Sequence, residues 1–529
     1  MIQLYINGKI HTFGPAGKVD WLLCAAGNIL ALGPEDTRPQ YLTGLAHTID
    51  LHKATVIPAF TDAHTHFVTT ALKAIQIDLD ETDSLSAALR KIKSFQNSFK
   101  PGQWVRGGGY NKNVWQDGQP HKKYLDKIFP NNPVALESKD FHAIWVNSKA
   151  LEIAGINNNT TDPAGGRIIR DKNKETSGLL YEKAVNLIYE KASLPADQVI
   201  TESVQLLAKQ MHAVGITTVH TMEGLGEFQA LQKMAIEDTL EIRTRFYIPK
   251  KEGRKLIDAN IRSGFGNANI SIAGIKFFTD GSLGSQTAHM LEPYPGTTGK
   301  GISHISEGAL AEEILFYNMN GLNAAVHAIG DQAIIKTLNA FEFAQNKQNH
   351  DKLRNRIEHA QLVPLDQMQR IAGLNLAASM QPVHIADDVE IAERYWGKRC
   401  VQAYPIAQLQ NAGVTLAFGS DTPVADYNPF KGVYEALERK YMFDPEQPSW
   451  YPQQAILLKD ALKAYTMGPA IACGDEKHCG SLEPGKYADF IVLDRDIFNV
   501  ASQQLLDTKV MKTIMNGKVI FSRSSEEKY

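Results

Sequence analysis

Two histidines stand two positions apart at the end of an apolar run near the start of the chain. The run VIPAFTDAHTHF, residues 56–67, contains His64 and His66. Residues i and i+2 of a strand point to the same face, so both imidazoles can reach one metal ion. An H-x-H pair alone is a weak signal, but its place directly after an apolar strand strengthens the prediction of a metal site.

Four more polar residues stand where later apolar runs end: Lys276, His327, His359 and Asp421. The ends of barrel strands supply the active-site residues of (β/α)8 barrels. Taken singly, each residue is more often an ordinary hydrogen-bonded histidine or a solvated loop charge. Their spacing favours a common site, because a barrel of ~250 residues with eight repeats has ~31 residues per repeat. His327 lies 32 positions before His359, and Asp421 lies 62 positions after it.

The same spacing assigns each of these residues to a particular strand of the barrel. If Asp421 follows the eighth strand, then the fourth, fifth and sixth strands end in order at Lys276, His327 and His359. The H-x-H pair belongs to the first strand, and the runs that form the second and third strands are left open. The interval between the first and fourth strands exceeds three repeats by roughly 115 residues. An insertion after the first strand is therefore expected, at about residues 70–190.

Elements of the type that a barrel needs follow this insertion. Short apolar runs rich in β-branched residues alternate with amphipathic helical patterns, which predicts a parallel sheet. Residues 201–215 predict a helix with Thr201 as its N-cap. Helices predicted at 429–441 and 453–468 close the run. We therefore predict an α/β fold, with a (β/α)8 TIM barrel at residues 56–479.

The two ends of the chain have a different pattern from the barrel region, because they predict short strands with turn residues between them. Each end contains the tripeptide Asn-Gly-Lys, at residues 7–9 and 516–518. We expect the ends, residues 1–55 and 480–529, to pair into one small β-sandwich domain beside the barrel. Two unrelated β-edges are the alternative.

Composition favours a small-molecule substrate. Hydrophobic residues make up 43% and charged residues 21% of the 529 positions, and the formal net charge of -3 does not attract nucleic acid. Four cysteines do not make a disulfide framework, and Cys473, His478 and Cys479 match no zinc pattern. No run approaches the ~20 apolar residues of a membrane span, and the N-terminus lacks the features of a signal peptide. We expect a cytoplasmic protein that binds neither nucleic acid nor membranes.

The set of six residues resembles the binuclear branch of the amidohydrolase superfamily. The segments IKFFTDGSLGSQTA, AVHAIGD, RIEHAQ and FGSDTPV are similar to its third amidohydrolase family, which includes N-substituted formamide deformylase. The similarity runs over about residues 1–521, nearly the whole chain. It also implies a β-domain that is split between the two termini.

The resemblance implies a hydrolase that cleaves a C–N bond of a small amide, an N-formyl amine or an N-acyl amine. The implied ligands are His64, His66 and Asp421 for one divalent ion and His327 and His359 for the other. Lys276 would bridge them as a carbamate, because an ammonium group offers no lone pair. A metal-activated hydroxide would attack the carbonyl, and Asp421 would act as general base and then general acid. Zinc is the first candidate, with one or two ions per chain.

Three further residues are candidates for substrate contact, with ordinary packing as the alternative for each: Trp115, His142 and Gln381. The closest rival function is a deaminase of a heterocyclic base. Such deaminases lack the lysine and carry a glutamate near the histidine of the fifth strand, whereas His327 is followed by Ala-Ile-Gly-Asp. A non-catalytic scaffold is the other alternative, and the retention of all six residues argues against it. The substrate, the metal and the oligomeric state are left open, a homo-oligomer included.

Overall fold

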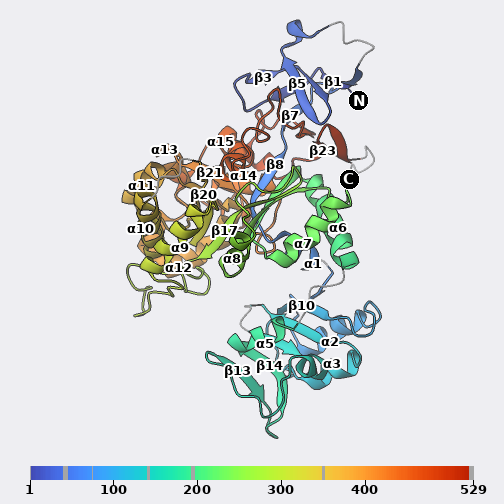
Figure 1. Cartoon of the computed structure of the whole chain (residues 1–529), viewed down its shortest axis with the longest axis vertical. Helices are drawn as coiled ribbons and strands as arrows, with labels where there is room; N and C mark the ends of the chain where they lie inside the picture. The colour runs from blue at the N-terminus through green and yellow to red at the C-terminus, as the bar shows by residue number, and fades with distance from the viewer. Residues whose placement is uncertain are drawn as a thin grey trace. The chain divides into compact units, whose positions relative to one another are not determined.

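The computed structural model of the protein (Figure 1) describes residues 2–39, 46–73, 75–80, 82–112, 114–139, 143–191, 197–347 and 352–523. The chain divides into two compact units, one of Met1–Phe67 with Gln205–Tyr529 and one of Val68–Val204. The insertion predicted at about residues 70–190 lies within the second unit. The first unit is therefore discontinuous in sequence.

The first unit contains an eight-stranded parallel sheet whose neighbouring strands follow one another in chain order. Its strands are β8 (Phe60–Thr65), β15 (Ile216–Thr221), β16 (Arg243–Pro249), β17 (Ile270–Phe278), β18 (Ala324–Ala328), β19 (Arg356–His359), β20 (Ala377–Met380) and β21 (Thr415–Phe418). An isolated parallel bridge joins Thr65 to Thr422, so the sheet is a nearly closed barrel. The predicted barrel is thus confirmed, and β15 and β16 are the second and third strands that the sequence left open.

Helices connect these strands or follow the last of them, and their apolar faces are buried. They are α6 (Asp197–Ala213), α7 (Leu225–Ile236), α8 (Lys250–Asp258), α9 (Glu307–Met319), α10 (Asp331–Lys347), α11 (Met368–Gly373), α12 (Ile385–Trp396), α13 (Ile406–Asn411), α14 (Pro429–Glu438), α15 (Leu458–Ala464) and α16 (Met467–Cys473). In α9, Ser306 accepts a hydrogen bond from the Ala309 N–H, and Leu310, Ile314 and Tyr317 form one buried face. None of the helices described here is long and apolar enough to cross a membrane.

Three helix boundaries differ from those predicted. Helix α6 begins at Asp197, so Thr201 lies inside the helix and is not its N-cap. Helix α14 stops short of the predicted end because Arg439 adopts a left-handed conformation with a φ of 54°. The region predicted as one helix at 453–468 contains α15 and the start of α16, which are separated at Thr466 by a non-helical φ of -131°.

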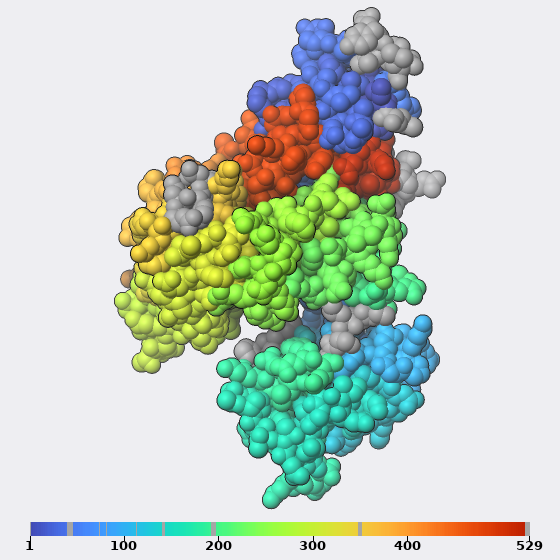
Figure 2. Space-filling model, in the orientation of Figure 1, coloured from blue at the N-terminus to red at the C-terminus, as the bar shows by residue number. Residues whose placement is uncertain are grey.

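Strands from both ends of the chain pair in a second sheet of the first unit, with the order β24-β23-β22-β7-β2-β3. These strands are β2 (Lys9–His11), β3 (Lys18–Val19), β7 (Thr55–Pro58), β22 (Phe490–Leu493), β23 (Val510–Met515) and β24 (Lys518–Ser522). A further sheet has the order β5-β4-β1-β6, from β1 (Ile2–Ile6), β4 (Trp21–Ala25), β5 (Asn28–Gly33) and β6 (His47–Asp50). The N-terminal segment, in blue, and the C-terminal segment, in red, accordingly lie side by side (Figure 2).

Apolar side chains of these two sheets share one hydrophobic cluster, to which Tyr5, Leu22 and Phe490 belong. The repeated Asn-Gly-Lys tripeptide has two different roles. Asn516 and Gly517, with φ values of 51° and 69°, form the two-residue turn between β23 and β24, as a type I′ hairpin requires. The first copy instead links β1 to β2, which lie in different sheets. The sandwich packing and the domain boundaries remain predictions.

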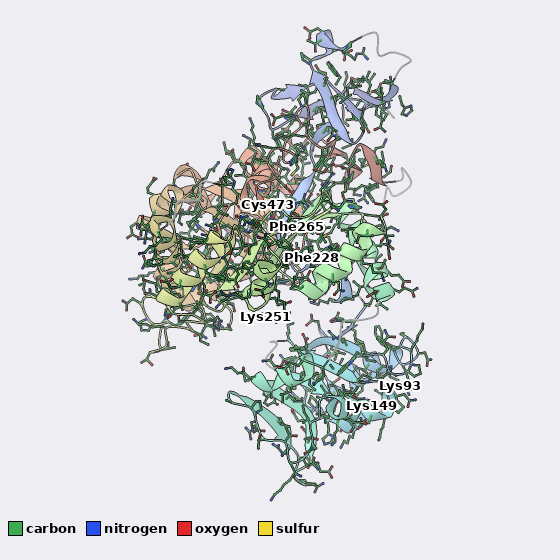
Figure 3. The ribbon with its side chains drawn as sticks, viewed as in Figure 1. Lys93, Lys149, Phe228, Lys251, Phe265 and Cys473 are labelled. Carbon is green, nitrogen blue, oxygen red and sulfur yellow. The ribbon has the colours of Figure 1, made fainter. Side chains whose placement is uncertain are left out.

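The second unit has a six-stranded mixed sheet with the order β13-β14-β12-β11-β10-β9. Its elements are β9 (Ile77–Asp78), α2 (Leu85–Ser94), β10 (Val105–Tyr110), α3 (Lys122–Ile128), β11 (Val134–Ser138), β12 (Ala143–Val146), α4 (Ser148–Ile153), β13 (Gly166–Arg170), β14 (Thr176–Glu182) and α5 (Asn186–Tyr189), and α1 (Phe67–Lys73) precedes them. Tyr110, Trp115 and Trp145 lie in its core. Lys93 on α2 and Lys149 on α4 lie on its exposed surface (Figure 3).

Candidate metal centre

The six predicted residues line one cavity at the carboxyl end of the barrel strands. This cavity, of about 390 Å³, is lined by residues that include His64, His66, Lys276, His327, His359 and Asp421. They come from β8 and the residue that follows it, from β17, β18 and β19, and from the segment that follows β21. Parallel barrel strands all end at the same rim, which is why residues so far apart in sequence meet here.

One half of this set forms a compact cluster. Ligand atoms of His64, His66 and Asp421 all lie within 4.8 Å of one another, and in the described part of the chain no other three His, Cys, Asp or Glu residues do so. The Asp421 Oδ1 atom is 3.5 Å from His64 Nε2 and 3.3 Å from His66 Nε2. The backbone N–H of Asp421 also donates to the His64 carbonyl at 2.7 Å. This contact links the end of the last strand to the first.

The other half lies beside the cluster. The ring centroids of His327 and His359 are 4.5 Å apart, and those of His64 and His359 are 4.8 Å apart. Lys276 is only 2% exposed, and its Nζ lies 5.1 Å from the centroid of the Phe278 ring. Burial is the main cause that lowers the pKa of Lys276 to about 8. A fraction of this amine is therefore neutral near pH 7, and a neutral amine is a nucleophile.

Hydrogen bonds decide which nitrogen of each buried histidine faces the cavity. The His64 Nδ1 atom lies 2.6 Å from Glu358 Oε2, and the His359 Nδ1 atom donates to Gln381 Oε1 at 2.9 Å. Each ring then keeps Nε2 as a free lone-pair donor. His327 differs, because its Nε2 donates to the Gly281 carbonyl at 3.0 Å and leaves Nδ1 free.

The charges of the site suit a cation. Burial lowers the pKa of His64 to about 4 and that of His327 to about 3, so both rings are neutral at pH 7. Burial alone raises the pKa of Asp421, but the neighbouring imidazoles, His64 first among them, outweigh burial and hold the pKa well below its usual value. Neutral imidazoles and an ionised carboxylate are the forms that bind divalent metals. The residues present therefore fit a divalent ion.

Comparison with known proteins agrees with this geometry. A model of the Amidohydrolase family matches residues 47–521. The chain belongs to this family. Protein LONG AFTER FAR-RED 3 of Arabidopsis thaliana is 31% identical over 98% of this chain and 91% of its own length. N-substituted formamide deformylase of Arthrobacter pascens is 28% identical over 98% of each chain.

Solved structures of metal-dependent hydrolases also resemble this chain. A crystal structure of an uncharacterized metal-dependent hydrolase from Pyrococcus horikoshii matches with a TM-score of 0.82, at 28% identity over 95% of this chain and 99% of the other. The predicted resemblance is therefore confirmed, and the protein is a hydrolase of the amidohydrolase superfamily.

Three residues predicted to touch substrate in this amidohydrolase have different surroundings. Gln381 is fully buried and contacts His359 Nδ1, which favours a role in positioning that ring. Trp115 is 4% exposed in the core of the second unit, where its indole N–H donates to the Thr82 carbonyl at 2.9 Å, so packing is favoured there. His142 lies outside the described residues. Substrate contact by these three residues stays a prediction.

Other residues of the amidohydrolase cavity had not been singled out from the sequence. They include Phe278 on β17, Gln361 after β19, and His384, Asp388 and Ile391 in or next to α12. Most of them lie on loops or on one helix, where neighbouring residues in sequence give no strand-end signal. Two adjacent acids in the first turn of α12 were the available hint.

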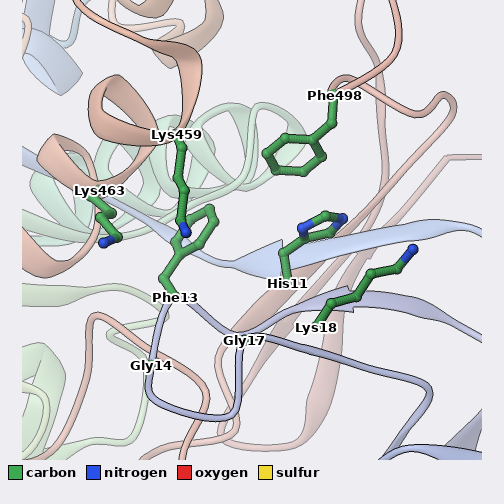
Figure 4. A pocket seen from close by; sticks show the side chains of 8 residues that line it. All are labelled: His11, Phe13, Gly14, Gly17, Lys18, Lys459, Lys463 and Phe498. Carbon is green, nitrogen blue, oxygen red and sulfur yellow. The ribbon is translucent and has the colours of Figure 1, made fainter.

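A different cavity of the first unit, of about 250 Å³, is lined by a different set of side chains (Figure 4). His11 stacks on Phe498 there, with ring centroids 3.9 Å apart. Its other lining residues include three lysines: Lys18, Lys459 and Lys463. With one imidazole and no carboxylate among its described lining residues, this cavity offers no metal-ligand set.

A buried ion pair lies behind the candidate ligand His64. Arg356 and Glu358 are both fully buried, and the Arg356 Nε–H donates to Glu358 Oε1. Burial raises the pKa of Glu358, but the Arg356 guanidinium and His64 outweigh it and hold the pKa well below its usual value. Glu358 is therefore ionised when its other oxygen accepts from His64 Nδ1.

Arg356→Met is expected to lower the free energy of unfolding by about 3–5 kcal/mol, because it leaves the Glu358 carboxylate buried without its cation. The midpoint of urea unfolding of the metal-free protein measures this loss. The matched control is Arg354→Met, which removes a 3.0 Å pair with Glu476 whose side chains are both 31% exposed. The control should change stability by less than about 1 kcal/mol. Equal effects of the two substitutions would contradict the role of the buried pair.

Proposed function

We propose that the protein is a metal-dependent hydrolase that cleaves the C–N bond of a small amide, with N-formyl and N-acyl amines as its substrates. The observation that carries this proposal is the convergence of the six predicted residues on one cavity. The relative named N-substituted formamide deformylase supports the bond type. The cavity volume of about 390 Å³ suits a small molecule.

The metal would be held by this chain's own neutral imidazoles and carboxylate. His64, His66 and Asp421 would hold one ion, and His327 and His359 would hold a second. Lys276 would link the two as a carbamate, formed when its neutral amine attacks carbon dioxide, makes an N–C bond and releases a proton. When bound, divalent metal supplies Lewis acidity that acidifies water and polarises a carbonyl oxygen. Zinc is the first ion to test.

Asp421 would carry the proton in this reaction. Its carboxylate is ionised and lies at the cavity wall, so it can accept a proton from the attacking water. Water then adds to the carbonyl carbon, the C–N bond breaks, and the same proton passes from Asp421 to the leaving nitrogen. The products are an amine and a carboxylic acid. Glu358 and Gln381 would orient His64 and His359 throughout.

Dialysis against a chelator is expected to abolish hydrolysis of a panel of N-formyl and N-acyl amines, and added zinc, manganese or nickel should restore it. Activity is measured as amine and acid released in equal amounts. Metal analysis of the purified protein gives the number of ions per chain. Ammonia released from heterocyclic amines, with no acid released from the panel, would instead support a deaminase.

A further inference from the structure

We propose that Asp388 and Gln361 form a subsite that selects substrates whose amine portion carries a second nitrogen, positively charged or bearing N–H donors. This inference rests on the proposed function and specifies its substrate class. Both side chains line the same cavity as the candidate metal ligands. Asp388 lies in the first turn of α12, and Gln361 follows β19 by two positions.

A buried tyrosine holds the two side chains. The Tyr404 hydroxyl donates to Asp388 Oδ2, and the Gln361 side chain hydrogen-bonds the same hydroxyl. Tyr404 is itself fully buried, so its hydroxyl cannot turn to water. One oxygen of Asp388 and the amide nitrogen of Gln361 are thus engaged, and both side chains are fixed in place.

Two acceptor atoms remain without a donor. Gln361 is 4% exposed, and its Oε1 has no hydrogen-bond partner among the described residues. The structure gives Asp388, in the same described ranges, no hydrogen bond beyond the one from Tyr404. Buried polar atoms are normally satisfied by protein, water or ligand. A ligand with N–H groups would supply the donors that this wall lacks.

The charge of the cavity wall also favours a ligand with a positively charged nitrogen. Apart from the six residues of the metal centre and the ring of His384, Asp388 is the one titratable side chain in the described lining. The His384 Nε2 atom donates to the Ser420 carbonyl at 3.1 Å. A carboxylate on the substrate would meet acceptors and a negative charge, whereas an ammonium group would find an ion pair.

Apolar side chains line the rest of this cavity. Leu283, Ile329 and Ile391 belong to the same lining, and they suit the alkyl part of a substrate. Burial raises the pKa of Asp388, which is the desolvation cost of a buried carboxylate, and His384 and the Tyr404 hydroxyl offset only part of this cost. A bound ammonium would offset this cost. The substrate class that fits is therefore an N-acylated diamine with an aliphatic chain.

The test compares N-formylcadaverine with N-hexylformamide, which has a methyl group in place of the ammonium. Wild type is expected to prefer the cationic compound in kcat/KM by about tenfold to a hundredfold, the usual value of a hydrogen bond to a charged group. Asp388→Asn should remove this preference while hydrolysis of N-hexylformamide stays within a few-fold of wild type. Asp387→Asn, at the exposed neighbouring acid, is the matched control and should keep the preference.

A binding measurement separates this proposal from the proposed function. Calorimetry of N-formylcadaverine against N-hexylformamide, with the metal-free protein, involves no turnover and should show tighter binding of the cationic compound to wild type and to Asp387→Asn than to Asp388→Asn. Equal hydrolysis and equal binding of the two compounds by wild type would overturn the subsite and leave the hydrolase intact. Selective binding of N-formylcadaverine without hydrolysis of any amide would retain the subsite and refute the proposed reaction.

Discussion

Asp421→Asn is expected to lower kcat at least about 10²–10⁴-fold, the usual contribution of one positioned proton-transfer group. An amide can neither accept the proton of the attacking water nor return it to the leaving nitrogen. The fold should survive, because Asp421 has a φ of 61° and asparagine is one of the residues that tolerates this left-handed conformation. Its backbone N–H also keeps the bond to the His64 carbonyl.

The measurement is kcat per bound metal ion, since Asp421 is both a candidate ligand and the candidate base. Asp426→Asn, at an exposed acid that pairs with Lys431 at 2.6 Å, is the control and should leave kcat unchanged. A rate for Asp421→Asn within a few-fold of wild type would show that another group moves the proton. A rate that falls only in parallel with metal content would assign Asp421 to ligation alone.

Lys276→Met is expected to reduce metal affinity by at least about 10–100-fold, because removal of a group that merely orients a ligand already costs that much. Loss of a bridging anion should also prevent the binding of two ions per chain. The reason lies in the position of Lys276, whose buried side chain lines the same cavity as His64 and His327. Equilibrium dialysis with zinc measures both the affinity and the number of ions.

Added bicarbonate, a source of carbon dioxide, tests whether Lys276 carries a carbamate. Metal-free wild type reloaded with zinc should regain activity faster when bicarbonate is added, whereas Lys276→Met should not respond. High-resolution crystallographic density should show the carboxyl group on Nζ. A plain ammonium that faces away from a well-occupied metal site would refute the two-ion version, although a hydrolase with one ion would remain compatible with the other five residues.

The sequence by itself determined the barrel and a set of six residues that line one cavity at its mouth. The alternation of apolar runs and amphipathic helices is a local pattern, so it can be read without knowing the fold. Parallel strands of a barrel end at one rim, and this rule turned the spacing of Lys276, His327, His359 and Asp421 into the prediction of a common site. The exact helix ends were less accurate, because φ values such as that of Arg439 depend on local packing.

Only the tertiary structure decided how the site is supported and what else its cavity contains. Glu358 stands 294 positions from His64, and the two side chains meet only because β8 and β19 belong to the same barrel. Asp388 on α12 and Tyr404, 16 positions further along the chain, are joined by a direct hydrogen bond between their side chains. Such contacts depend on side-chain directions across separate elements. The free energy of those hydrogen bonds is set by burial, which becomes defined only when the barrel has closed.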